Sequence, residues 1–288
     1  MSDAATEVRE FSIDIPEGEI IDLKSRLAST RWPDAETPDD WSQGLPLEYH
    51  QEFCKYWETE YDWYKTQEKL NKFPQFKSRF DGIDIHFVHV RSKENNARPL
   101  IITHGWPGSI VEFQKVIAPL TDPVGHGGKP EDAFHVVCPS LPGFGFSDKP
   151  TGTGWGVIKI AEVWNQLMLR LGYDRYFAQG GDWGSAVTTM IGLQNLGNCK
   201  GLHVNMPSSP PTKEALSNPD DKDKKAFAAG QFYQQWDSGY SKQQATRPQT
   251  LGYGLSDSPS GQAGWVLEKF YAWTDCNGHP ENVISRDE

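Results

Sequence analysis

The sequence predicts an α/β fold, a mostly parallel sheet with helices on both faces. Three observations in this 288-residue chain lead to it. Between residues 76 and 207, short apolar runs of strand length alternate with stretches of helical periodicity, the pattern of repeated strand–helix–strand units. Glycine-rich turns follow the predicted strands. The segments on either side have helical patterns only, which predicts a helical extension and a helical insert.

The first predicted domain, residues 1–75, is an N-terminal extension rich in tryptophan, proline and charge. Ile20, Leu23 and Leu27 recur at helical spacing and predict an amphipathic helix that Pro33 would stop. A second helix is predicted over residues 47–70, because its aromatic side chains fall on one face. We therefore expect the extension to be helical.

The second predicted domain, residues 76–207, is the first part of the α/β core. The dipeptide Asp81-Gly82 separates two runs of strand character, which predicts a hairpin. Strands are expected at residues 76–80, 83–90, 100–103, 134–138, 176–179 and 202–205, and helices over residues 110–120, 157–171 and from Ser185 onward.

The most informative motif lies between Tyr176 and Ser185. Gly180 and Gly184 flank Asp182 at the spacing of a nucleophile elbow, a sharp strand-to-helix turn that exposes its central side chain. A carboxylate at that position is ionised at neutral pH and can attack a saturated carbon without a base. This favours epoxide opening or halide displacement over ordinary ester hydrolysis. The alternative is an Asp that only caps the following helix.

A second glycine-rich turn, His104-Gly105-Trp106-Pro107-Gly108-Ser109, also follows a predicted buried strand. Reactive groups of such sheets lie at the carboxyl ends of the strands, so we expect this turn above the elbow. There the backbone N–H groups of Trp106 and Trp183 would form an oxyanion hole, in which each donor contributes about 3 kcal/mol to the transition state. A plain structural turn is the alternative.

The third predicted domain, residues 208–288, loses the strand rhythm. Its helical segments are interrupted by Pro210-Pro211, Pro248 and Pro259. A segment of this kind after a sheet is typical of a lid over the active site, so we expect an incomplete helical lid.

The composition excludes several classes of function. The chain has 39 Asp and Glu against 28 Lys and Arg, a net charge of −11, and no basic cluster, so nucleic acid is not an expected partner. No apolar stretch approaches the ~20 residues of a membrane span, and the first residues do not form a signal peptide. The four scattered cysteines predict neither disulfides nor a zinc site. We expect a soluble, cytoplasmic protein without cofactor or metal. The sequence leaves open whether the protein forms a homodimer.

Together these motifs resemble the epoxide hydrolases of the α/β-hydrolase superfamily, in the branch with an N-terminal extension that includes microsomal-type, fungal and bacterial enzymes. The resemblance implies an α/β-hydrolase fold and the conversion of a small apolar epoxide and water to a vicinal diol. The matching segments run through nearly the whole chain in the family's order: Ile15-Pro16 through Arg31-Trp32-Pro33-Asp34, Asn71-Lys72-Phe73-Pro74-Gln75-Phe76, His104 through Ser109, Pro139-Ser140-Leu141-Pro142-Gly143-Phe144, Gln179 through Gly184, and Thr246-Arg247-Pro248.

The resemblance also implies roles for four residues. Asp182 would be the nucleophile that forms an alkyl ester, and Trp106 and Trp183 would be the oxyanion donors. Tyr240, seven residues before Arg247, would match one of two lid tyrosines that hydrogen-bond the epoxide oxygen. A lid tyrosine that only packs its ring is the alternative.

Three features of the family are not found in the sequence: the catalytic His, its acid and the second lid tyrosine. None of the eight histidines fits the catalytic position, which should follow the last two strands. With about 30 residues or more for each βα unit, we expect the chain to be truncated by about 60–100 residues and to lack these strands. Such a chain would start the reaction without completing it. Two other functions are open: a haloalkane dehalogenase-like hydrolase, which also uses an Asp followed by Trp, or a catalytically dead remnant that binds a ligand.

Overall fold

The computed structural model describes residues 7–288, and the chain divides into two compact units. Of the described residues, unit 1 contains 7–14 and 64–208, and unit 2 contains 15–63 and 209–288. Each unit therefore combines a piece of the N-terminal extension with a later part of the chain.

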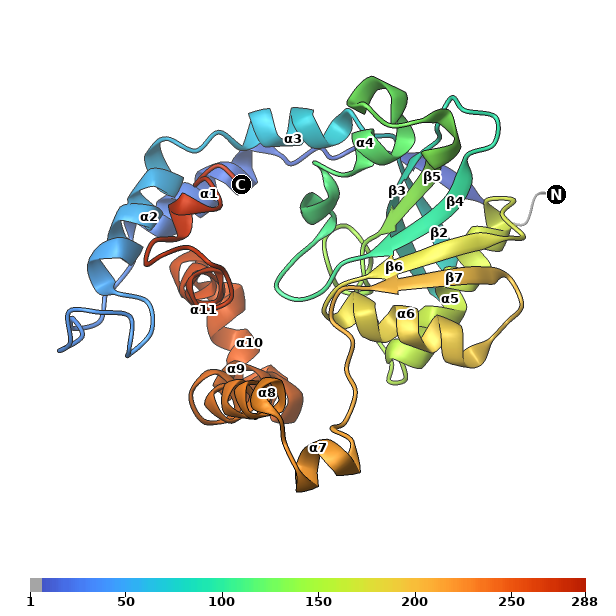
Figure 1. The fold of residues 1–288 in the computed structure, drawn as a ribbon. Helices are drawn as coiled ribbons and strands as arrows, with labels where there is room; N and C mark the ends of the chain where they lie inside the picture. Colours follow the sequence, from blue (N-terminus) through green and yellow to red (C-terminus); the bar gives the residue numbers. More distant parts are fainter. Residues whose placement is uncertain (1–6) are drawn as a thin grey trace. The chain divides into compact units, whose positions relative to one another are not determined.

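Within its described residues, unit 1 contains a seven-stranded sheet with the order β1-β2-β3-β5-β4-β6-β7 (Figure 1). The neighbours from β1 to β5 pair antiparallel, and those from β5 through β4 and β6 to β7 pair parallel. The predicted α/β fold is confirmed, with a sheet that is mixed rather than mostly parallel. The strands are Val8–Phe11 (β1), Gln75–Phe80 (β2), Ile83–Val90 (β3), Arg98–Thr103 (β4), Phe134–Pro139 (β5), Tyr176–Gly180 (β6) and Cys199–Val204 (β7).

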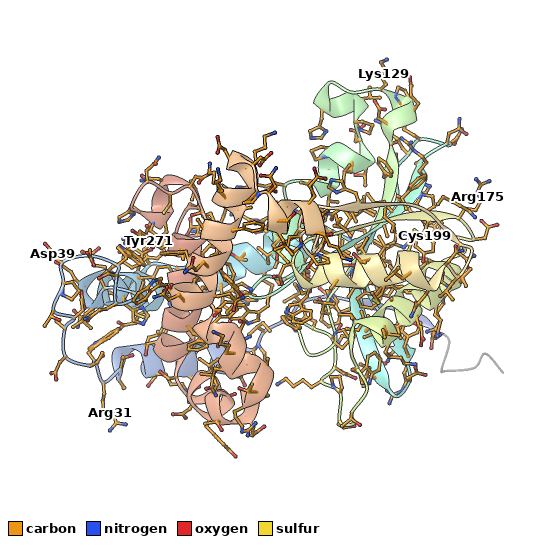
Figure 2. All side chains as sticks on the ribbon, turned by 60° about the horizontal axis from the view of Figure 1, so that its bottom comes forward. Arg31, Asp39, Lys129, Arg175, Cys199 and Tyr271 are labelled. Atoms are coloured by element: carbon orange, nitrogen blue, oxygen red, sulfur yellow. The ribbon has the colours of Figure 1, made fainter. Side chains whose placement is uncertain are left out.

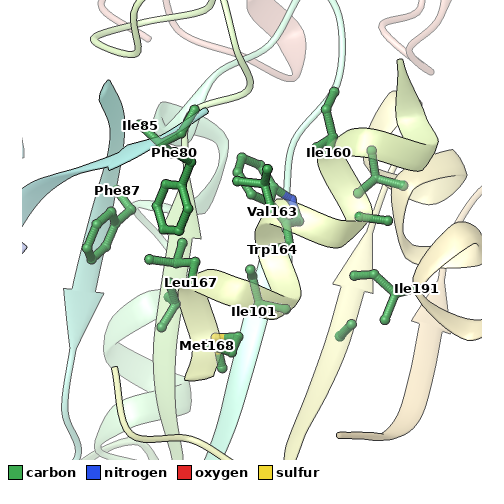
Figure 3. Packing of buried hydrophobic residues seen from close by; sticks show 14 of the residues in the cluster. Phe80, Ile85, Phe87, Ile101, Ile160, Val163, Trp164, Leu167, Met168 and Ile191 are labelled. Carbon is green, nitrogen blue, oxygen red and sulfur yellow. The ribbon is translucent and has the colours of Figure 1, made fainter. Parts of the chain in front are cut away.

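Helices cover both faces of the sheet, as predicted. On one face, α5 (Val157–Arg170) and α6 (Trp183–Gln194) bury Trp164 and Leu167 against strand residues such as Ile101 (Figure 3). On the other face, the 3-10 helix η1 (Ile110–Phe113) and helix α4 (Ile117–Thr121) pack on Leu100 and Ile102. Successive residues of β4 thus enter opposite cores, because side chains alternate along a strand.

The structure corrects three of the predicted elements. Residues 8–11 form a strand on β2 instead of part of a helical extension. The helix predicted over 47–70 is interrupted between α2 (Leu47–Thr59) and α3 (Trp63–Asn71), where the chain passes from unit 2 to unit 1. The helix predicted over 110–120 is split into η1 and α4. Pro119 explains why residues 110–120 do not form one helix, since proline fits the first turn of α4 but not the interior of a longer helix.

Unit 2 is helical, as the sequence predicts for residues 15–63 and 208–288. Its N-terminal and C-terminal parts contact each other: the ring of Trp41 stacks on Tyr271, labelled in Figure 2, with centroids 4.0 Å apart. The helices are α1 (Glu17–Ala28), α2, α7 (Lys213–Ser217), α8 (Asp221–Phe232), α9 (Gly239–Thr246), α10 (Pro248–Asp257) and α11 (Pro259–Ala272), with a π-helical turn at Tyr233–Asp237. Throughout the described chain, every helix is too short or too polar to cross a membrane.

Candidate active site

Asp182 occupies the turn between β6 and α6, at the carboxyl end of a strand that lies between β4 and β7. Its backbone has φ 50° and ψ −123°, a strained conformation that residues other than glycine rarely adopt. In the described chain its side chain makes no hydrogen bond to the first turn of α6. The alternative of a helix-capping Asp is therefore not what the structure shows, and the carboxylate is available for other contacts.

Two glycines make this turn possible. A Cβ atom on Gly180 would lie 2.0 Å from the carbonyl oxygen of Gly184, and one on Gly184 would lie 2.0 Å from the carbonyl oxygen of Thr103. Only hydrogen side chains let the start of α6 approach the ends of β6 and β4 so closely. The glycine spacing seen in the sequence is thus a packing requirement, which holds Asp182 above the sheet edge.

The loop after β4 approaches the same carboxylate. The backbone N–H of Trp106 donates a hydrogen bond of 2.8 Å to Asp182 Oδ1. Gly105 permits this contact, because a Cβ atom there would lie 2.2 Å from the same oxygen. The peptide bond between Trp106 and Pro107 is cis. The structure therefore brings together Asp182 and Trp106, two of the predicted site residues.

Trp183, the other predicted donor, is the first residue of α6. Backbone N–H groups in the first turn of a helix have no partner within the helix, and the helix dipole favours negative charge there. The residue is 56% exposed, although its backbone begins α6. Its place next to Asp182 agrees with the predicted role without testing it.

His104 links the loop after β4 to the loop after β5. The Leu141 N–H donates to His104 Nε2 at 3.1 Å, so Nε2 carries no proton and Nδ1–H donates to the Gly105 carbonyl at 3.0 Å. Burial lowers the pKa of this imidazole, while the charge of Asp182 partly opposes that shift. His104 is thus neutral, and hydrogen bonds between both ring nitrogens and backbone groups position the loop after β4. Its role is structural, as the sequence predicts.

Glu112 is a neighbour of the site that sequence reasoning missed. Burial of its carboxyl group and the charge of Asp182 together raise its pKa to about 7. The nearby backbone N–H groups of Ser109 and Gly105 oppose this rise of the pKa, because they favour the ionised carboxylate. Its position three residues after Ser109 is the only signal in the sequence, and no local pattern indicates that it reaches back to the loop.

Tyr240 lies in unit 2, on helix α9. Its hydroxyl is 3.3 Å from that of Tyr233, and Trp273 packs edge-on against its ring with centroids 5.2 Å apart. The Lys269 ammonium lies 4.8 Å from the centroid of the Tyr240 ring. Asp237 accepts from Lys269 Nζ at 2.6 Å and from Trp273 Nε1 at 2.7 Å.

Across residues 7–288, no three His, Cys, Asp or Glu side chains are grouped so that they could hold a metal ion. The cysteines, at positions 54, 138, 199 and 276, are all free thiols.

Comparisons with known proteins place this geometry in a family. The model of the epoxide hydrolase N terminus matches residues 8–113, and that of the α/β-hydrolase fold matches residues 98–236. A putative epoxide hydrolase of Stigmatella aurantiaca is 51% identical over 98% of this chain and 64% of that protein. The solved structure of the Aspergillus niger epoxide hydrolase superposes with a TM-score of 0.87 at 30% identity, over 98% of this chain and 74% of that one. The chain belongs to the epoxide hydrolases.

This epoxide hydrolase chain is similar to relatives from distant organisms. Epoxide hydrolase 1 of Sus scrofa is 36% identical over 93% of the chain, and the chain spans 63% of that protein's length. It spans 64% of the Stigmatella aurantiaca relative. The match in both units, including the N-terminal extension, confirms the resemblance to the branch that carries this extension.

Proposed function

We propose that Asp182 of this chain opens an epoxide by direct attack and forms an alkyl ester, the first step of the conversion of an epoxide to a vicinal diol. The observation that carries the proposal is the 2.8 Å hydrogen bond from the Trp106 N–H to Asp182 Oδ1. One carboxylate oxygen is thus held by the backbone. The other, Oδ2, is left to attack, as an ionised nucleophile that needs no base.

In the first step, Asp182 Oδ2 forms a bond to an epoxide carbon while the carbon–oxygen bond of the ring breaks. The electron pair of that bond moves to the epoxide oxygen, which takes a proton from a hydroxyl group. Tyr240 is the proposed donor, and the hydroxyl of Tyr233 at 3.3 Å and the cation of Lys269 over its ring support this role.

In the second step, water attacks the carbonyl carbon of the ester, and the negative charge develops on Oδ1. The N–H of Trp106 already points at this atom, and the N–H of Trp183 is the proposed second donor. Donors that are oriented before the reaction stabilise such a charge without reorganisation. We assign no described residue as the base of this step, so the part of the reaction proposed for these 288 residues is alkylation of Asp182.

The experiment is to incubate the chain with styrene oxide and follow its intact mass. We expect a single adduct with the mass of the whole epoxide, located at Asp182 by peptide mapping. D182N should give no adduct, and D174N, a change at an exposed position next to β6, should react like the wild type. Equal labelling of D182N would show that Asp182 is not the nucleophile.

The same assay separates the dehalogenase alternative. With a bromoalkane, attack by Asp182 would release bromide and add only the alkyl group, without an oxygen atom. Reaction with the bromoalkane but not with styrene oxide would replace the epoxide proposal. Steady production of diol by the chain would instead extend it, because the second step would then also occur here.

A further inference from the structure

Glu112 lies beside the loop that carries the Trp106 donor. It belongs to η1, the short helix that follows this loop directly. A Cβ atom on Gly108 would lie 1.4 Å from Glu112 Oε1, so the carboxyl group lies directly against the loop backbone although the residue keeps an exposed surface. The nearby backbone N–H groups of Gly105 and Ser109 favour its ionised form.

This carboxylate joins the two ends of the loop. Gly105 precedes Trp106, and Gly108 and Ser109 end the turn, so a carboxylate that lies against Gly108 and attracts the N–H groups of Gly105 and Ser109 holds the backbone on either side of the Trp106 N–H. The helix that carries Glu112 is itself anchored, because Ile110 and Phe113 are buried in the core formed with β4 and β5. The backbone of Glu112 is therefore held by the hydrophobic core, through the buried side chains next to it in η1.

The charge of Glu112 also acts on the nucleophile. Asp182 and Glu112 are close enough that the charge of Asp182 raises the pKa of Glu112. The interaction is mutual, so an ionised Glu112 also disfavours the negative charge on Asp182. Alkylation removes that charge, which means that the ionised form of Glu112 favours the first step in two ways, through the loop and through repulsion.

We propose that Glu112 is a positioning residue for alkylation of Asp182, and that its carboxylate holds residues 105–109 with the Trp106 N–H directed at Asp182 Oδ1. The proposal rests on the proposed function of Asp182. It adds a second acidic residue in the same unit, which touches neither the epoxide nor the reacting atoms and acts only through the loop and its charge.

Protonation of Glu112 should weaken its effect. Its pKa is raised to about 7, first by burial and then by Asp182. The other ionisable groups near it in unit 1 are His104, which is neutral, and His135 and Cys138 of β5, which packs on η1. Burial lowers the pKa of His135 and raises that of Cys138, so both are uncharged near neutral pH. Lys115 is a basic residue of the same segment, two positions after η1. Glu112 is thus the group expected to change charge near pH 7.

The test is the rate of alkylation by styrene oxide, measured by intact mass from about pH 5 to about pH 9. In the wild type, the rate should rise through about pH 7 as Glu112 loses its proton. E112Q should be about tenfold slower above pH 7 and should lose this rise, since small shifts of a positioned group have effects of that order. E131Q, at an exposed acidic position in the same unit, is the matched control and should keep both the rate and the pH profile.

A second variant guards against a folding defect in E112Q. G108A would displace the Glu112 carboxyl group without removing it, and should also slow alkylation and flatten the pH profile. A wild-type rate and pH profile in E112Q, with the adduct still at Asp182, would overturn the role of Glu112 and leave the proposed function standing. If the wild-type chain forms no adduct at any pH, both proposals are wrong.

Discussion

The two units hold their site residues by different means. In unit 1, Asp182 and Trp106 are fixed through backbone atoms: close glycine contacts, hydrogen bonds to main-chain groups and strands buried on both faces. In unit 2, Tyr240 is surrounded by side chains: Lys269, Trp273 and Tyr233. The comparison indicates that substitutions in unit 1 act through sterics and burial, whereas those around Tyr240 act through charge.

The largest expected effect is that of acid on unit 1. His86 is fully buried between Ser140 and Gln75, and burial, with a smaller effect of Lys77, lowers its pKa to about 3. In the unfolded chain it titrates near 6.5, so below that pH the unfolded state binds more protons. The stabilisation is complete above about pH 6.5 and is lost as the pH falls towards 3, by up to about 5 kcal/mol.

Hydrogen exchange of peptides from β2 and β3, measured at intervals over this pH range, checks the prediction. H86Q removes the titrating group and should flatten the dependence for these peptides. The peptides of α10 and α11 in unit 2 serve as the internal control. An unchanged slope in H86Q would show that other groups cause the acid sensitivity.

The second prediction concerns the elbow. G184A places a Cβ atom 2.0 Å from the Thr103 carbonyl oxygen and 2.8 Å from that of His104. Both are backbone atoms of the central sheet and its loop, so they cannot move aside as a flexible side chain could. We expect a loss of about 3 kcal/mol in the free energy of unfolding of unit 1, measured by urea denaturation. Stability within about 0.5 kcal/mol of the wild type would contradict the close packing on which the elbow depends.

The third prediction turns to the charges of unit 2. The Lys269 side chain is only 7% exposed and pairs with Asp237 and Glu268. K269M leaves these carboxylates without their cation, which should cost about 2 kcal/mol, less than for a fully buried pair because Glu268 keeps more contact with water. Urea denaturation followed by exchange in α11 measures the loss.

A double-mutant cycle sharpens this result. K269M combined with D237L removes both charges, and we expect it to recover part of the stability lost in K269M alone. Equal stability of K269M and the double variant would mean that Lys269 acts through packing of its methylene groups and not through its charge.

The sequence was most informative where the physics is local. The order of strands and helices in unit 1 follows from periodicity, and the Gly180–Gly184 spacing around Asp182 follows from the geometry of one turn. The strand Val8–Phe11 was missed because four residues show no clear period and their partner β2 is more than 60 residues away. The break between α2 and α3, near Tyr61, lies where the chain passes from one unit to the other, and no local sequence pattern indicates that division.

The candidate site divides in the same way. Asp182 and the loop of Trp106 could be predicted because each is a contiguous motif with defined backbone chemistry. Glu112 was missed, because its link to the site is a side chain that reaches back to backbone N–H groups. Lys269 was missed because its partner Asp237 is 32 residues away and on another helix. Contacts of that kind are set by tertiary packing and leave no mark on periodicity.

The smallest expected effect is a gain of stability, which tests the contrast between the glycines of the two units. Gly230 lies on an exposed face of α8, with a helical backbone and no atom within 4 Å of the place where a Cβ would be. G230A therefore removes only the entropy that glycine loses on folding, and should stabilise α8 by about 0.5–1 kcal/mol. Exchange in the α8 peptide should slow while exchange in unit 1 stays unchanged. The same substitution at Gly184 is expected to destabilise, so one chemical change would have opposite signs in the two units. A destabilised G230A would show that α8 packs more closely than its exposed surface indicates, and that sterics govern unit 2 as well.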